Sequence, residues 1–175
     1  HPDNVLPAVV GGLTISCKEQ DRISYFKINV PFNISFAVMI PNFTLSTKQS
    51  RKVLPDIVTR EDVIFNISRA CLLTASLLTG TTENLKVAVQ DRLHQPYRKK
   101  FIPHWDEIVN ACYKLNASAV FLSGAGPSLI AVLNEDNCDT GEYIEKIYGL
   151  LRSYDESWIV NKSYPCKDGI RVIRK

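Results

Sequence analysis

The chain has 175 residues, of which 45% are hydrophobic and 22% are charged, and its formal net charge is +3. These values are typical of one globular domain, or of one domain plus part of another, with enough apolar residues for a core. The basic residues are dispersed and no apolar run reaches the ~18 residues of a membrane helix, so we expect no nucleic-acid partner and no membrane span.

The pattern of apolar and turn-forming residues predicts an α+β fold. From residue 34 onward the order is strand, several helices, strand, strand, helix and strand, which is typical of a split βαβ, ferredoxin-like arrangement with extra helices. Pro31 marks the best boundary, so residues 1–31 are predicted to end one domain and residues 32–175 to form a second. The predicted helices are 5–10, 47–54, 60–78, 82–93, 105–116 and 140–153, and the predicted strands are 13–16, 23–30, 34–40, 119–122, 128–134, 157–162 and 169–174.

Several element ends carry specific signals. Asn4 is a candidate N-cap for the first helix, and Ser46 or Thr47 for the second. Apolar residues recur at spacings of three and four along 60–78, and Gly80 ends that helix. The continuous apolar run 34–40 predicts a strand buried on both faces.

Cysteine usage indicates the redox environment. The chain has five cysteines at wide spacings, and none is in a Cys-x-x-Cys pair. This pattern fits neither a disulfide framework nor a zinc site, so we expect reduced thiols, no metal site and a cytoplasmic protein.

Two segments combine small or basic residues in a way that suits ligand binding. The loop Ser-Gly-Ala-Gly-Pro-Ser at 123–128 is either a structural turn or a nest of backbone N–H groups for an anion, and the residues leave both open. Thr47 and Arg51 are four apart on one helical face. Arg51 is either a surface charge or a bidentate ligand for a carboxylate, with the Thr47 hydroxyl beside it.

Two further segments are dense in polar groups. In Asp-Arg-Leu-His-Gln-Pro-Tyr-Arg, Asp91 and Arg92 suggest an ion pair on a helix surface, whereas Pro96 constrains the loop that carries Arg98. The stretch His1 to Asn4 offers an imidazole, a carboxylate and an amide within four residues. Its alternative interpretation is a helix N-terminus in which Asp3 or Asn4 satisfies backbone N–H groups.

Taken together, HPDNVLPAVVGGL, STKQSRKVLP, DRLHQPYRKKFIP and LSGAGPS resemble the signatures of homoserine kinases, in the GHMP kinase superfamily, in the same order. The resemblance implies ATP-dependent phosphorylation of the side-chain hydroxyl of L-homoserine to O-phospho-L-homoserine, in threonine biosynthesis, with Mg²⁺. By this resemblance, Arg51 and Arg98 hold the substrate carboxylate, and Thr47 lies close to the site. His1, Asp3 and Asn4 line the amino-acid pocket, with Asn4 at the position of a proposed base, and Gly124 and Gly126 shape the pocket.

The sequence departs from that family in one respect. Homoserine kinases carry a glycine- and serine-rich loop for the ATP phosphates, and no such stretch occurs here. We therefore expect the C-terminal part of such an enzyme, inactive alone, with the Mg²⁺ ligands mostly in the missing N-terminal segment, which is itself a candidate partner. The sequence also leaves open whether the chain forms a homodimer. The alternatives are another GHMP small-molecule kinase and a non-catalytic ligand-binding or dimerisation fragment.

Overall fold

The computed structural model describes residues 2–29, 33–155 and 157–173. Its elements follow the predicted order, apart from two additional helical turns in 95–101 and the absence, from the described residues, of the strand predicted for 169–174. The predicted boundary at Pro31 lies outside the described residues. The elements are α1 (Pro2–Val10), β1 (Leu13–Glu19), β2 (Arg22–Ile28), β3 (Ile34–Ile40), α2 (Thr47–Lys52), α3 (Arg60–Thr79), the 3₁₀ turn η1 (Thr82–Asn84), α4 (Leu85–Ala88), α5 (Gln95–Arg98), η2 (Lys99–Phe101), α6 (Trp105–Lys114), β4 (Ala119–Leu122), β5 (Leu129–Asn134), α7 (Thr140–Tyr154) and β6 (Ile159–Ser163).

A four-stranded antiparallel sheet organises the larger part of the molecule, with the strand order β4-β5-β3-β6. β3 is central and pairs with both β5 and β6; Ala37 lies opposite Ala131 on one side and opposite Lys162 on the other. Since neighbouring strands are antiparallel, β4 and β3 run parallel to each other on either side of β5. In the same way, β5 and β6 run parallel to each other on either side of β3. This is the split βαβ arrangement, so the predicted ferredoxin-like α+β fold is confirmed.

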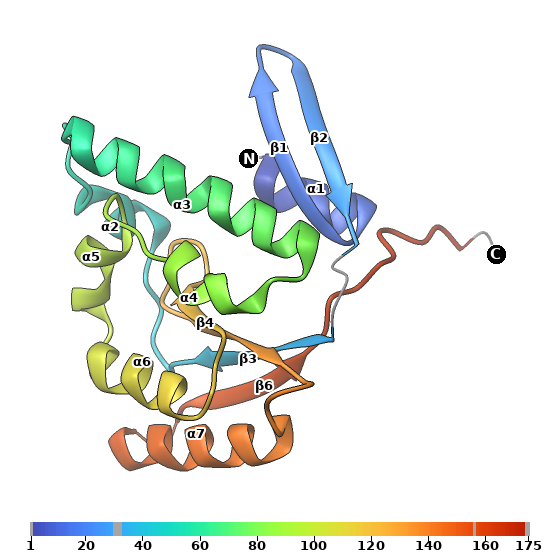
Figure 1. The fold of residues 1–175 in the computed structure, drawn as a ribbon. Helices are drawn as coiled ribbons and strands as arrows, with labels where there is room; N and C mark the ends of the chain where they lie inside the picture. The colour runs from blue at the N-terminus through green and yellow to red at the C-terminus, as the bar shows by residue number, and fades with distance from the viewer. Residues whose placement is uncertain (1, 30–32, 156, 174–175) are drawn as a thin grey trace.

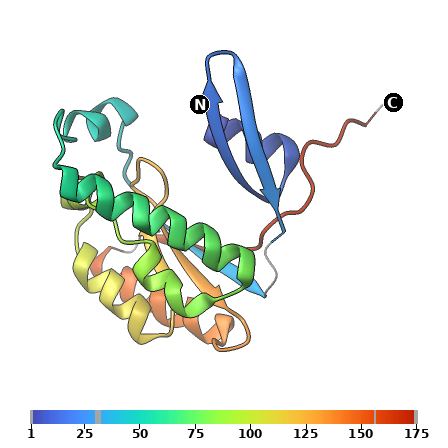
Figure 2. The same ribbon diagram turned by 45° about the horizontal axis from the view of Figure 1, so that its top comes forward.

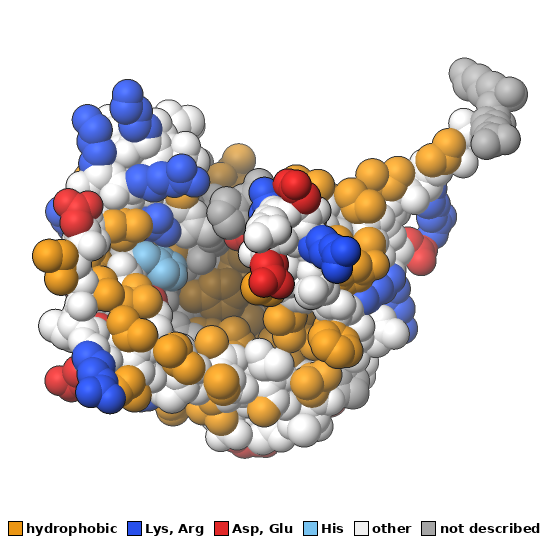
Figure 3. All heavy atoms as spheres, turned by 90° about the horizontal axis from the view of Figure 1, so that it is seen from above, with side chains coloured by type: hydrophobic (Ala, Val, Ile, Leu, Met, Phe, Trp, Pro, Cys, Tyr) orange, Lys and Arg blue, Asp and Glu red, His pale blue; other side chains and the backbone are white. Residues whose placement is uncertain are grey.

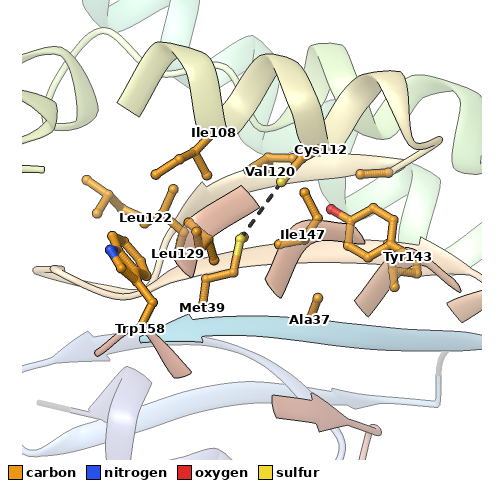
Figure 4. Close-up of a cluster of buried hydrophobic side chains, with 14 of the residues drawn as sticks. Ala37, Met39, Ile108, Cys112, Val120, Leu122, Leu129, Tyr143, Ile147 and Trp158 are labelled. Carbon is orange, nitrogen blue, oxygen red and sulfur yellow. Dashed lines mark hydrogen bonds between the residues drawn. The ribbon is translucent and has the colours of Figure 1, made fainter. Parts of the chain in front are cut away.

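Helices α6 and α7 cover one face of this sheet and enclose the main core (Figure 1). In Figure 4, Met39 of β3 points toward Cys112 of α6, and the two sulfur atoms are 3.8 Å apart. Both side chains are fully buried, as is Ile147 of α7. Because each layer contributes side chains without solvent exposure, this core fixes the sheet that carries the polar loops.

Helix α3 lies over the opposite face of the sheet, together with α4. Its C-terminal end is the predicted one, because Gly80 takes the left-handed conformation with φ 77°. Its N-cap, which the sequence analysis did not name, is Thr59, whose hydroxyl accepts a hydrogen bond from the Asp62 N–H. Leu73 and Leu77 pack on a second apolar cluster with β3, β4 and β5. The outer face of β3 is only partly covered, so burial on both faces is not complete.

By length and composition alone, α3 is also long and apolar enough to cross a membrane, contrary to the expectation from the sequence. Core helices of soluble proteins pass the same test. Its apolar residues lie on two faces. One face packs on the second cluster, whereas Ile64, Ile67 and Leu78 on the other face are each more than half exposed.

The N-terminal unit consists of α1 and the β1–β2 hairpin, which rises from the body of the molecule (Figure 2). α1 begins at Pro2, so the prediction that Asn4 caps this helix is wrong. The C-terminal segment returns to this unit. Lys27 Nζ donates hydrogen bonds to the carbonyls of Val10 and Lys167, at 2.7 and 2.8 Å.

The strand predicted for 169–174 is not present in the described residues, which end at 173. The Ile170 N–H instead donates to the Val9 carbonyl at 3.1 Å, and Val172 and Ile173 are more than 80% exposed. A Cβ atom on Gly169 would lie 1.9 Å from that carbonyl oxygen, so only glycine allows this close approach. The alternating pattern was misleading because a strand also needs a neighbour to pair with.

Candidate active site

The site is built around the loop 123–128, which connects β4 to β5. The Ser123 N–H donates to the Ser128 carbonyl at 2.8 Å, and the Gly126 N–H donates to the Ser123 carbonyl at 3.0 Å. Gly124 and Gly126 have φ values of 57° and 80°. A Cβ atom on Gly126 would lie 2.9 Å from Leu122, whereas one on Gly124 would meet nothing within 4 Å. The glycines are therefore needed mainly for backbone conformation.

Arg98, the last residue of α5, is held by backbone carbonyls from two distant segments. Its Nε donates to the Ser50 carbonyl at 3.3 Å, and its Nη1 donates to the Gly124 carbonyl at 3.1 Å. In the loop 123–128, the Gly124 carbonyl thus points toward the positive charge of Arg98. The recorded bonds give no direct support to the hypothesis of an anion nest in this loop.

Ser50 of α2 connects the same three segments and was not recognised in the sequence. Its side chain is fully buried, and its hydroxyl donates to the Ala125 carbonyl at 2.8 Å. Because its own carbonyl accepts from Arg98, Ser50 links α2, α5 and the loop 123–128 at one point. A serine inside a short polar helix carries no pattern that distinguishes it from a surface residue.

Arg51 follows Ser50 in α2 and shares the neighbourhood of Arg98. Of the two predicted N-caps, Ser46 is the N-cap and forms a capping box with Gln49, and both Thr47 and Arg51 are exposed. Burial lowers the pKa of Arg98; Asp91 opposes this effect, and the positive charge of Arg51 adds to it. None of the hydrogen bonds or ion pairs found among the described residues engages the Arg51 guanidinium.

The two arginines therefore form a region of positive charge with capacity left for an anion. Arg98 uses Nε and Nη1 on carbonyls, and its Nη2 makes no hydrogen bond recorded in the described part of the chain. A bound carboxylate would relieve the repulsion between the guanidinium groups and accept hydrogen bonds from both.

Asp91 organises the loop that leads into α5. Its carboxylate accepts hydrogen bonds from the Asn66 side chain at 2.6 Å and from the N–H groups of His94 and Gln95 at 2.7 and 2.6 Å. Burial alone would raise the pKa of Asp91, but these hydrogen bonds outweigh it and the pKa is lowered. The expected Asp91–Arg92 pair is wrong, because Arg92 turns away to Glu61 at 3.2 Å.

His94 lies between this carboxylate and Arg98. Its Nδ1 is 3.4 Å from Arg98 Nη1, and its Nε2 is 3.7 Å from an Asp91 oxygen. Burial lowers the pKa of His94; the charge of Arg98 lowers it further, and Asp91 opposes both effects. A neutral imidazole at neutral pH can accept the Arg98 hydrogen bond, which a protonated ring cannot.

The structure does not bring Asp3 and Asn4 into the Arg51–Arg98 group. Both residues are exposed on α1, and Figures 1 and 2 place α1 beside the hairpin and apart from α2. His1 lies outside the described residues. The polar residues named above thus form two separate groups, one on α1 and one around the loop 123–128.

Potential metal ligands and the cysteines were also located in the described residues. These residues contain no group of three His, Cys, Asp or Glu side chains arranged to hold a metal ion. The five cysteines are all free thiols, as expected.

Comparison with known proteins shows which proteins this chain is similar to. Residues 73–140 match the family model described as GHMP kinases C terminal. The chain is 40% identical over 173 residues to homoserine kinase of Petrotoga mobilis, covering 99% of this chain and 55% of that protein. It is 49% identical over 136 residues to homoserine kinase of Caldicellulosiruptor bescii, covering 78% of this chain and 44% of that protein.

A solved structure agrees with these sequence relationships. Homoserine kinase from Cytophaga hutchinsonii matches with a TM-score of 0.88 and 25% identity, covering 99% of this chain and 54% of that one. The chain thus spans about half the length of the relatives it matches. Residues 73–140 are similar to the GHMP kinases C terminal family, and nearly the whole chain is similar to part of homoserine kinases.

Proposed function

We propose that the chain forms the C-terminal part of a homoserine kinase, which transfers a phosphoryl group from ATP to the side-chain hydroxyl of L-homoserine. The observation that carries this proposal is that Arg98 is held by the carbonyls of Ser50 and Gly124, next to Arg51, whose positive charge acts on the pKa of Arg98. The product would be O-phospho-L-homoserine, and the reaction would serve threonine biosynthesis in the cytoplasm. Similarity to proteins named homoserine kinase supports this choice of substrate.

In this proposal the two arginines recognise the substrate carboxylate. Arg98 is pre-positioned by the Ser50 and Gly124 carbonyls, so little conformational entropy is lost when Nη2 donates to the ligand. The exposed Arg51 supplies the second guanidinium. A site with two arginines discriminates against an alcohol without a carboxylate, because their repulsion then stays uncompensated.

The remaining residues would complete the pocket. Thr47 contributes a hydroxyl next to Arg51. For Asn4 to take the place of a base, with His1 and Asp3 lining the amino-acid pocket, α1 has to lie closer to α2 than it does in this structure. Gly124 and Gly126 set the loop conformation. Phosphoryl transfer depends mainly on positioning and charge neutralisation, so an amide at the base position is compatible with it. ATP supplies the phosphoryl group, and its phosphates and Mg²⁺ would be held by residues outside this chain.

Two alternatives remain candidates. Another GHMP kinase acting on a different small alcohol would share the fold, and a non-catalytic ligand-binding or dimerisation fragment would need no ATP. Dependence of turnover on the substrate carboxylate distinguishes the first alternative, since only a substrate with a carboxylate requires both arginines. ATP turnover distinguishes the second.

The test uses a joined protein, in which the part of the Petrotoga mobilis homoserine kinase without a counterpart here precedes residue 1. ADP release is measured with L-homoserine and with 3-aminopropan-1-ol, the same molecule without its carboxylate. We expect homoserine-dependent turnover that falls at least tenfold in Arg98→Ala and stays unchanged in the control Arg152→Ala on α7. Equal turnover of both alcohols would contradict the proposed substrate. The 175-residue chain alone is expected to be inactive.

A further inference from the structure

Two of the cavities in the described part of the chain differ in what lines them. The one between the sheet and α3 has a volume of about 370 Å³, and its lining residues are apolar or glycine. Hydrophobic side chains are also visible inside the hollow in Figure 3. The other has a volume of about 300 Å³ and lies at the β4 edge of the sheet, between α4, α5 and α6. We name it the edge cavity, and its lining includes Lys86, Pro96, Lys99, Trp105, Val109 and Tyr113.

One wall of the edge cavity is a row of apolar and aromatic side chains on α6. Trp105, Val109 and Tyr113 are four residues apart, so they share one face of the helix. All three are half-buried and also pack on the main core, which holds them in place. The wall is therefore a fixed surface that the apolar body of a ligand can contact.

The same cavity has hydrogen-bond donors with unused capacity. The Tyr113 hydroxyl accepts a hydrogen bond from the Val120 N–H at 3.2 Å, and no bond that it donates is recorded among the described residues. The Trp105 indole N–H makes no hydrogen bond recorded there either. Lys86 Nζ lies 4.6 Å from the centre of the Tyr113 ring and forms no ion pair within the described ranges. Lys99, by contrast, pairs with Asp106 at 3.0 Å.

The charges of the lining favour an anion that carries no cationic group. Among the described residues that line the cavity, Asp91 alone has a carboxylate. That carboxylate already accepts hydrogen bonds from the Asn66 side chain and from three backbone N–H groups. An ammonium group on a ligand would therefore meet Lys86 and Lys99 without a carboxylate free to bind it, whereas a ligand carboxylate could pair with Lys86.

We propose that the edge cavity binds a small monocarboxylic acid with an apolar body and no ammonium group, at a site separate from Arg51 and Arg98. The ligand carboxylate accepts hydrogen bonds from the Lys86 ammonium and from the free donors of the aromatic side chains, and its apolar body contacts the α6 wall. A volume of about 300 Å³ is at the lower limit of ligand pockets, so the acid is small.

Helix α5 connects the edge cavity with the arginine pair. Gln95 and Pro96 at its start line the cavity, whereas Arg98 at its end makes the hydrogen bonds to backbone carbonyls described above. The Gln95 side chain donates to the Val89 carbonyl at 3.1 Å and accepts from the Leu122 N–H at 2.9 Å. A bound acid adds contacts to α5 in the position that holds Arg98, so the acid and homoserine should favour each other's binding. This consequence rests on the proposed function.

Isothermal titration calorimetry of the 175-residue chain tests the site, with 3-phenylpropanoate as the probe. The control 3-phenylpropan-1-ol lacks the charge, and L-phenylalanine adds an ammonium group. We expect saturable binding of the acid, at least fivefold tighter than binding of either control. Absence of saturable binding, or equal binding of the acid and the alcohol, overturns the proposal.

Two pairs of substitutions test the location. Gln90→Glu adds a negative charge to an exposed lining residue, and we expect it to weaken binding of the acid at least fivefold. Its control Asn110→Asp adds the same charge to an exposed residue of α6 outside the lining. Lys86→Met should also weaken binding, whereas Lys100→Met, which removes a nearby charge outside the lining, should not. Equal effects within either pair would contradict the edge cavity as the site.

Arg98→Ala separates the edge cavity from the proposed substrate site. We expect this variant to bind the acid within twofold of the wild type, and loss of binding overturns the proposal because the probe would then occupy the arginine pair. In the joined protein, a saturating concentration of the probe should lower the KM for homoserine at least twofold, and an unchanged KM overturns the link through α5. Binding of the acid without turnover of homoserine would leave the cavity site in place and remove the proposed function, so the two failures can be distinguished.

Discussion

Replacing Ser50 by alanine tests whether this buried hydroxyl holds the candidate site together. The side chain has no solvent exposure, and its hydroxyl makes a 2.8 Å hydrogen bond to the Ala125 carbonyl. Losing one such bond costs about 0.5–1.5 kcal/mol net, and an acceptor left without a partner in a dry site costs ~1–3 kcal/mol. Since Ala125 is only half-buried and water can reach the loop, we expect a loss of about 1 kcal/mol.

The assay is thermal unfolding of the 175-residue chain, followed by tryptophan fluorescence from Trp105 and Trp158. A loss of 1 kcal/mol lowers the Tm by roughly 2–4 °C in a chain of this size. The control is Ser153→Ala, because that hydroxyl is exposed on α7 and donates only to the Leu150 carbonyl in its own helix. We expect the control to change stability by less than about 0.5 kcal/mol.

The same substitution should affect binding more than stability. Without Ser50 the loop 123–128 loses its tie to α2, and the Gly124 carbonyl that orients Arg98 is no longer fixed. In the joined protein, we therefore expect a higher KM for homoserine with little change in the KM for ATP. Wild-type stability together with a wild-type KM in Ser50→Ala would refute the role assigned to this residue.

Three other predictions concern the loop, the acid limit of stability and thiol reactivity. Gly126→Ala should destabilise the protein more than Gly124→Ala in urea unfolding, because both positions have positive φ, costing roughly 1–2 kcal/mol, but only Gly126 also meets a neighbour at 2.9 Å. The pKa of Asp91 is lower in the folded protein than its unfolded value of about 4, so the ionised Asp91 stabilises the fold above that pH. This stability is lost as the pH falls through the folded pKa. The stability of Asp91→Asn should therefore decline less steeply than that of the wild type below about pH 4. Burial raises the pKa of Cys112 to about 11, so at pH 8 it should resist iodoacetamide while the exposed Cys166 reacts.

The regular elements were largely readable from the sequence because their signals are local. The apolar run 34–40, the spacing along α3 and the glycine at 80 each depend on residues within a few positions. Local signals failed where tertiary contacts decide the conformation. The segment 169–173 alternates like a strand but is irregular and largely exposed, and it is connected to α1 by the hydrogen bond from the Ile170 N–H to the Val9 carbonyl.

The candidate site was only partly readable. Arg51 and Arg98 were selected by the resemblance to homoserine kinases, and the charge of Arg51 acts on the pKa of Arg98, so the two lie near one another. Ser50 and the loop-forming function of Asp91 depend on bonds between segments 75 and 25 residues apart, and no sequence pattern encodes those pairings. His1 lies outside the described residues, so its expected position remains a prediction.

The most direct measurement of the central claim is a double-mutant cycle on the joined protein, with kcat/KM for L-homoserine determined for Arg51→Ala, Arg98→Ala and the combined variant. If both guanidinium groups hold one carboxylate, each single substitution lowers kcat/KM at least tenfold, and the combined loss differs clearly from the product of the two. Full activity in either single variant, or losses that multiply as for two independent residues, would contradict a shared carboxylate site.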